Sequence, residues 1–192
     1  MTRMTVQDIV FMRHAEGVHN ARLPHGPYRD VPLTAHGVTT AAQAAERFRA
    51  ANVVRNPDVV FCTPHVRGQQ TAEPYRLAHP DVPFVLCDDM REWHNFDIAA
   101  DGILTMEVKL PLWEQQFTAC DPDLRGNLWG ETFREFVTRV RAVRAMLLAD
   151  PRDRIVCFSH ALFMLGLVLD LQDLLEPTAE CIRRIKDSQR TE

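Results

Sequence analysis

The chain has 192 residues, of which 46% are hydrophobic and 25% charged, and its formal net charge is -4. This balance is typical of one globular domain with a buried core, and we expect a single domain over residues 1–192. The acidic balance argues against a nucleic-acid partner. No apolar run approaches the ~20 residues that cross a bilayer, and the start of the chain lacks the apolar stretch of a signal peptide.

The cysteines indicate the compartment in which the chain works. They are odd in number, widely spaced and without a CxxC pair, so the sequence predicts reduced core residues of a cytoplasmic protein. They are Cys62, Cys87, Cys120, Cys157 and Cys181.

The first strand and helix are predicted before residue 52. Residues 9–12 are a short apolar run that stops at Arg13, a pattern typical of a buried strand. Thr34 can cap a helix that runs to about residue 51. Its apolar face is predicted to hold Val38, Ala41, Ala45 and Phe48.

The alternation of strands and helices continues along the chain. Residues 59–62 predict a strand, 66–78 a helix and 83–87 another strand. Thr132 begins the clearest helical periodicity, with arginines on one side. Its apolar side is predicted to hold Phe133, Phe136, Val137, Val140, Val143 and Leu147.

The end of the pattern decides the fold class. Residues 154–158 predict a fourth strand, and an apolar helix runs from there to about residue 171. Strands that alternate with helices predict an α/β fold, with a doubly wound, mainly parallel sheet flanked by helices. Residues 93–130 interrupt the pattern, and we interpret them as a small cap insertion with one helix over about 104–117. The tail, residues 177–192, shows no clear strand and is expected to be frayed or to contact a partner.

Polar side chains follow all four predicted strands. In an open α/β sheet, ligands bind beyond the carboxyl ends of the strands, so these side chains are expected to converge. In strand order they are Arg13 and His14, then Arg67, then Glu92, then Ser159 and His160.

This set of groups suits a phosphate ester. Arginine binds phosphate oxygens bidentately, and neutral imidazole can attack phosphorus near neutral pH. A carboxyl group can protonate the departing alkoxide, and the helix after His160 offers N–H groups and a positive dipole end. Taken singly, each residue has a structural explanation, such as a helix cap for Ser159. Their convergence on one edge favours a phosphate site.

Six short motifs resemble the histidine phosphatase superfamily, also called phosphoglycerate mutase-like. In chain order they are R-H-A-E-G-V-H-N at 13–20, D-V-P-L-T-A-H-G at 30–37, T-P-H-V-R-G-Q-Q-T-A at 63–72, R-E at 91–92, G-E-T at 130–132 and S-H at 159–160. The resemblance implies a doubly wound α/β fold with a partial cap, and a reaction without metal or cofactor.

Carried over residue by residue, the resemblance implies roles for six residues. His14 is the nucleophile and Glu92 is the proton donor. The phosphate group is held by Arg13, Asn20, Arg67 and His160. The expected partner is a small phosphomonoester. Neither nucleic acid nor membrane is expected as a partner, and the sequence leaves the oligomeric state open.

Two alanines depart from the superfamily pattern. Ala15 and Ala161 stand where glycine usually follows each histidine, and glycine permits positive φ or a close backbone approach. Alanine fits if both positions keep ordinary dihedral angles.

Three other functions stay open. A phosphomutase would need more cations in the cap, which offers Lys109 and Arg125. A non-catalytic phosphate-binding protein is suggested only by Ala15 and Ala161. A metallohydrolase would need ligand spacings such as HExxH, which the eight histidines do not show. The substrate itself is not predicted, because the aromatic cap can either pack internally or stack on a ring.

Overall fold

The computed structural model describes residues 7–51, 53, 56–99 and 102–188. Within them, four strands form one sheet in the order β1-β4-β2-β3, and every neighbouring pair is parallel. The strands are β1 (Asp8–Arg13), β2 (Val59–Cys62), β3 (Phe84–Leu86) and β4 (Arg154–Ser159). The predicted parallel α/β sheet is confirmed.

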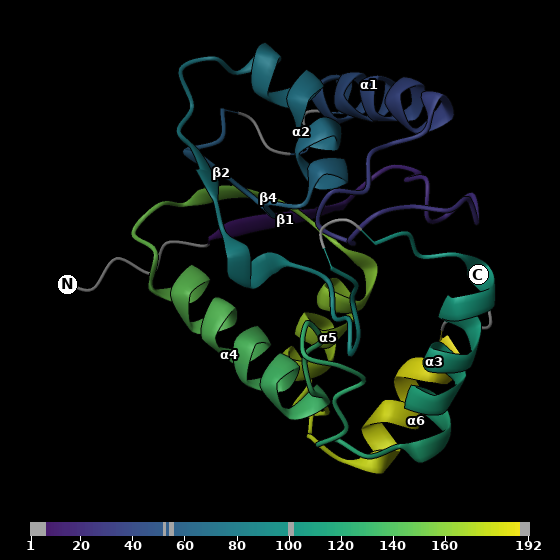
Figure 1. Cartoon of the computed structure of the whole chain (residues 1–192). Helices are drawn as coiled ribbons and strands as arrows, with labels where there is room; N and C mark the ends of the chain where they lie inside the picture. Colours follow the sequence, from purple (N-terminus) through teal and green to yellow (C-terminus); the bar gives the residue numbers. More distant parts are fainter. Residues whose placement is uncertain (1–6, 52, 54–55, 100–101, 189–192) are drawn as a thin grey trace.

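Helices cover both faces of this sheet (Figure 1). Helices α1 and α2 lie on one face, and α4 and α5 lie on the other. The six α-helices of the described residues are α1 (Ala35–Ala50), α2 (Val66–Ala78), α3 (Met106–Ala119), α4 (Phe133–Ala149), α5 (Ala161–Leu171) and α6 (Ala179–Ser188). A 3-10 turn, η1 (Asp88–Met90), follows β3.

The alternation of side chains along β4 explains why two layers of helices are needed. Ile155 and Cys157 belong to the core cluster beneath α4 and α5, whereas Val156 and Phe158 belong to the cluster beneath α1 and α2. Because successive residues of a strand point to opposite faces, an apolar run without alternation has to be covered on both sides.

The two predicted helix starts are held by side-chain caps. Thr34 Oγ1 accepts a hydrogen bond of 2.9 Å from the backbone N–H of Gly37 at the start of α1. Thr132 and Glu135 form a capping box at the start of α4. Threonine in this position satisfies backbone N–H groups that have no partner inside the helix.

Two details of the predicted helix faces are wrong. Val38 is 55% exposed, because α1 buries Gly37, Ala41 and Ala45, a stripe spaced at four residues that Val38 misses. Arg139 on α4 is buried instead of facing solvent, since its guanidinium is paired with Glu131.

The C-terminal tail is folded as far as residue 188. Helix α6 buries Cys181, Ile182 and Ile185 in the main core cluster, so the expectation of a frayed tail is wrong for this segment. Residues 189–192 lie outside the described residues. All five cysteines are free thiols, and four of them are buried. None of the described helices is long and apolar enough to span a membrane.

Candidate active site

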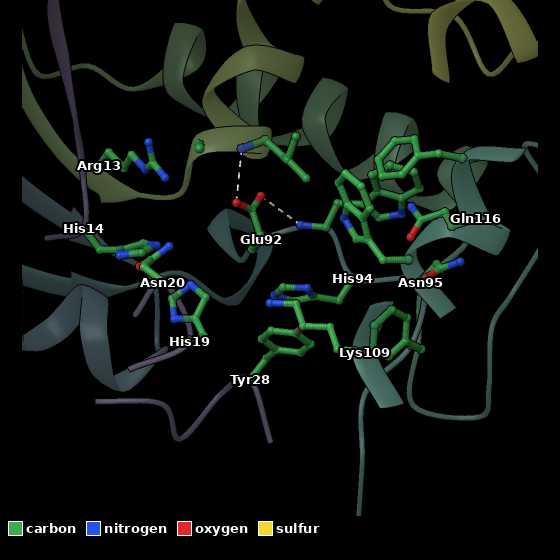
Figure 2. Close-up of a pocket in the computed structure, with 16 residues that line it drawn as sticks. Arg13, His14, His19, Asn20, Tyr28, Glu92, His94, Asn95, Lys109 and Gln116 are labelled. Atoms are coloured by element: carbon green, nitrogen blue, oxygen red, sulfur yellow. Dashed lines mark hydrogen bonds between the residues drawn. The ribbon is translucent and has the colours of Figure 1, made fainter. Parts of the chain in front are cut away.

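The predicted polar side chains do converge at the carboxyl edge of the sheet. A cavity of about 140 Å³ lies there, between the ends of β1 and β4 and the segment that carries α3 (Figure 2). Its wall includes Arg13, His14, Asn20 and Glu92. Arg67 and His160 are fully buried behind this wall.

His14 is held in the tautomer that leaves Nε2 unprotonated. Its Nδ1 donates a hydrogen bond of 2.7 Å to the backbone carbonyl of Ala15, which can only accept. The proton is therefore on Nδ1, and Nε2 keeps its lone pair. Burial, together with the positive charges of Arg67 and Arg13, lowers the pKa of His14 to about 3. The His14 imidazole is thus neutral at physiological pH.

Arg67 connects His14 to His160 and to the loop that carries Tyr28. Its Nε donates to His14 Nε2 at 3.3 Å, its Nη2 to His160 Nδ1 at 3.3 Å, and its Nη1 to the backbone carbonyl of Tyr28. No carboxylate of the described residues forms a salt bridge with it. Burial consequently lowers the pKa of Arg67 to about 10, although the negative charge of Glu92 acts in the opposite direction.

His160 is buried next to Arg67 and does not line the cavity. Because the guanidinium can only donate, His160 Nδ1 accepts, and its Nε2 carries the proton toward Thr63 Oγ1 at 3.0 Å. The imidazole ring centroids of His160 and His14 are 5.0 Å apart. Ser159, by contrast, does not cap α5, since its hydroxyl donates to the backbone carbonyl of Met90 at 2.7 Å.

Glu92 projects into the cavity with both carboxylate oxygens engaged (Figure 2). Oε1 accepts from the backbone N–H groups of Trp93 and Phe163, and Oε2 accepts from that of Leu162. The N–H groups at the start of α5, which we expected to serve phosphate, are therefore used to orient this carboxylate. Burial raises the pKa of Glu92, while these donors and Arg67 oppose that rise.

Asn20 and Arg13 complete the near side of the cavity. Asn20 Oδ1 accepts a hydrogen bond of 2.9 Å from the backbone N–H of Gly17, so its NH₂ group is the part left to donate. The Arg13 side chain is exposed and borders the cavity from the end of β1 (Figure 2).

The two alanines fit their positions without strain. Neither Ala15 nor Ala161 has a positive φ. The backbone N–H of Ala15 donates to Thr71 Oγ1 at 3.0 Å, which fixes the turn after His14. Ordinary dihedral angles at both positions meet the condition under which alanine can replace glycine.

Two other glutamates near the motifs have structural partners. Glu16 accepts from Thr34 Oγ1 at 2.6 Å, which ties the loop after β1 to the start of α1. Glu131 is paired with Arg139 at 2.6 Å and with Arg91 at 3.0 Å. Glu92 is the one glutamate among the described residues of the cavity wall.

A cluster of rings around the cavity was not predicted. Tyr28 and His94 stack with centroids 3.7 Å apart and an interplanar angle of 10°. Lys109 Nζ lies 5.5 Å from the centroid of the Tyr28 ring. His19 lines the cavity beside His14, with centroids 5.5 Å apart. The contacts of Tyr28 with His94 and Lys109 join residues far apart in the sequence. His19, in contrast, belongs to the motif at 13–20, and His94 lies two residues after Glu92.

Within the described part of the chain, no group of three or more His, Cys, Asp or Glu side chains is placed to hold a metal ion. The described cavity wall presents the His14 imidazole, the Arg13 guanidinium and the Glu92 carboxyl group.

Comparison with known proteins agrees with this geometry. Residues 9–184 match the model of the histidine phosphatase superfamily (branch 1). The chain belongs to this superfamily. No curated protein matches the sequence.

Several solved structures share the fold. An Escherichia coli protein described provisionally as an alpha-ribazole-5'-P phosphatase has a TM-score of 0.70 at 22% identity, over 92% of this chain and 83% of its own. A phosphoserine phosphatase variant of Entamoeba histolytica, solved with phosphoserine, has a TM-score of 0.64 at 20% identity, over 88% and 81%. A mycobacterial glucosyl-3-phosphoglycerate phosphatase, solved with VO3, has a TM-score of 0.65 at 20% identity, over 91% and 83%. At these identities the likeness establishes the fold.

Proposed function

We propose that the protein is a metal-independent phosphomonoester hydrolase that works through a phosphohistidine at His14. The observation that carries this proposal is the anchored tautomer of His14, which lines the cavity with Arg13 and whose unprotonated Nε2 accepts a hydrogen bond from Arg67. The match to the superfamily and the phosphatases among its structural neighbours support the same reaction class.

The proposed reaction has two steps. His14 Nε2 attacks phosphorus and forms a P–N bond while the P–O bond to the substrate breaks, and Glu92 gives its proton to the departing oxygen. Water then attacks the phosphohistidine, Glu92 takes a proton from that water, and the P–N bond breaks to release phosphate. Arg13 and Asn20 donate hydrogen bonds to the phosphoryl oxygens from the cavity wall. Arg67 donates with the Nε–H that His14 Nε2 gives up when it attacks, and His160 supports the guanidinium.

Rapid quench with ³²P-labelled substrate tests the covalent step. Label is expected in a base-stable, acid-labile linkage at His14, and His14→Ala is expected to remove both the label and turnover. His36→Ala is the matched control, because His36 is an exposed residue of α1 that does not line the cavity. Label on a serine or an aspartate would refute the mechanism.

A phosphomutase is the second candidate, and Lys109 is the observation that favours it, because a mutase has to bind a second anionic group. The two reactions differ in their product. A hydrolase releases inorganic phosphate in proportion to the substrate consumed, whereas a mutase returns a positional isomer, and ³¹P NMR of the reaction distinguishes them.

Domain organisation and location are part of the same proposal. We infer one domain over residues 1–192 with a cap insertion over about 93–130, because Trp93 and Phe117 share the main core cluster with Phe133 and Ile155. The five free thiols support a cytoplasmic location.

A further inference from the structure

The cavity continues beyond the phosphate-binding residues to a second cation. Its far wall is formed by the segment that carries α3, and Lys109 of that helix points into the same space as His14 from the opposite side (Figure 2). The chain has only two lysines, and the other, Lys186, is on α6.

Lys109 is partly buried and has no acidic partner. Among the described residues, no carboxylate lies within salt-bridge distance of its ammonium group, which rests over the Tyr28 ring. A cation–π contact of this kind offsets only part of what burial of a charge costs. Burial lowers the pKa of Lys109, and the nearby positive charge of Arg67 lowers it further. A negative group placed beside Lys109 would therefore be stabilised.

The platform beneath the ammonium group is rigid. Tyr28 is 3% exposed and stacks on His94, and its ring also contacts His19, His25 and Phe96. The ring on which the Lys109 ammonium group rests is therefore fixed by its neighbours, in the same cavity that His14 lines.

The charges of the cavity wall leave Lys109 unbalanced. Among the described residues, Glu92 is the single carboxylate of the wall, and both of its oxygens already accept backbone hydrogen bonds. A phosphate dianion bound at His14 would be balanced by Arg13 and Arg67. The charge of Lys109 remains for another group.

The far wall also offers an acceptor without a donor. Asn95 is 2% exposed and lines the cavity, and its Oδ1 has no hydrogen-bond partner. Since a buried acceptor without a partner is unfavourable, this oxygen suits a hydroxyl or amine group of a ligand.

We propose that Lys109 binds a second anionic group of the substrate, a carboxylate or a second phosphate, and so selects small phosphomonoesters with an acidic tail. The inference rests on the phosphohydrolase function proposed above. The cavity of about 140 Å³ is small beside the ~300–1,000 Å³ of typical ligand pockets, which favours a tail of a few atoms over a nucleotide.

Matched substrates test this inference. 3-Phosphoglycerate and glycerol 3-phosphate differ in one carboxylate, as do phosphoserine and phosphoethanolamine, and propane-1,3-diol bisphosphate carries a second phosphate. The wild-type enzyme is expected to have a higher kcat/KM for the acidic member of each pair. Lys109→Met should lower that preference by about ten-fold or more, the effect of losing one charge-assisted hydrogen bond. Nitrophenyl phosphate, which lacks an acidic tail, should be affected less than about three-fold.

Controls separate the possible results. Lys186→Met should leave every ratio unchanged. The carboxylate pairs and the bisphosphate decide which anion the site takes. An unchanged preference in Lys109→Met overturns the inference, as does an equal loss on all substrates, because Lys109 would then serve the transferred phosphate or the fold. If the wild-type enzyme hydrolyses nitrophenyl phosphate but does not prefer the acidic member of each pair, the inference about Lys109 is refuted and the hydrolase function stands. If it hydrolyses no phosphate ester, the inference and the hydrolase function are both refuted.

Discussion

Glu92→Gln is expected to slow alkyl phosphates far more than aryl phosphates. An alkoxide is a poor leaving group unless it is protonated, whereas nitrophenolate departs without a proton. Proton donation typically contributes about 10²–10⁴-fold, so turnover of glycerol 3-phosphate should fall by that range while nitrophenyl phosphate is spared. The measurement is the ratio of kcat for the two substrates in variant and wild type.

The structure also gives the stability effect of this substitution. Glu92 accepts three backbone N–H bonds, two at Oε1 and one at Oε2. A glutamine that keeps its oxygen at Oε1 retains two of them and presents its NH₂ to the N–H of Leu162, so one bond is lost. Losing such an acceptor costs about 1–3 kcal/mol, and each kcal/mol lowers the Tm of a chain of this size by about 2–4 °C. Thermal denaturation checks this.

The pH dependence provides a second readout for Glu92. Since burial raises its pKa, the acid form persists to higher pH than in a free glutamate. The kcat of wild-type enzyme for alkyl phosphates should fall as pH rises through that pKa, and Glu92→Gln should lose this limb. Glu16→Gln is the matched control, because Glu16 is bonded to Thr34 outside the cavity wall. An equal slowing of alkyl and aryl substrates by Glu92→Gln would show that Glu92 only positions α5, and the assignment as acid would be wrong.

Three further predictions follow from the site and its supports. Arg67→Lys keeps the charge, but an ammonium group cannot reach the three partners that the guanidinium reaches. The kcat/KM for nitrophenyl phosphate should therefore fall by roughly ten-fold or more. Near-normal activity would show that Arg67 takes no part in the reaction. Because the pKa of His14 is lowered to about 3, kcat/KM should not fall through protonation of His14 as the pH is lowered past 6.5. A fall of kcat/KM near pH 6.5 that ionisation of the substrate does not explain would contradict this. Glu131→Gln leaves the buried Arg139 without its partner and should lower the free energy of unfolding by about 3–5 kcal/mol in urea denaturation, so a loss below 1 kcal/mol would refute the pairing as a structural element.

Local sequence signals predicted the elements of this fold well. Thr34 and Thr132 marked helix starts because a cap acts within three residues of itself. The apolar face of α4 was predicted in full, since a helix of 17 residues gives the period several turns in which to show. Helix α6 has 10 residues in a charged tail, and its buried face depends on the core it meets.

For the site, the strand ends predicted which side chains lie close together, but not the hydrogen bonds that these side chains make. Arg13, His14 and Glu92 reach the cavity because the ends of parallel strands meet at one edge. Asn20 also lines the cavity, but only the resemblance to the superfamily implied it. The sequence did not indicate that the N–H groups of α5 would serve a carboxylate. Nor did it predict the stack of Tyr28 on His94, because that contact depends on how two loops meet in space.

The burial of Arg67 links the folding of the protein to the binding of anions. A guanidinium taken from water without a carboxylate partner destabilises the folded chain, as its lowered pKa of about 10 reflects. The rotamer entropy of its side chain is also lost on folding, since three protein groups already fix it. An oxyanion that meets this arginine therefore finds a donor that needs no further ordering, and relieves the unbalanced charge as it binds. Phosphate or vanadate should accordingly raise the Tm in proportion to the logarithm of its concentration above Kd, and the fold is most stable when its site is filled.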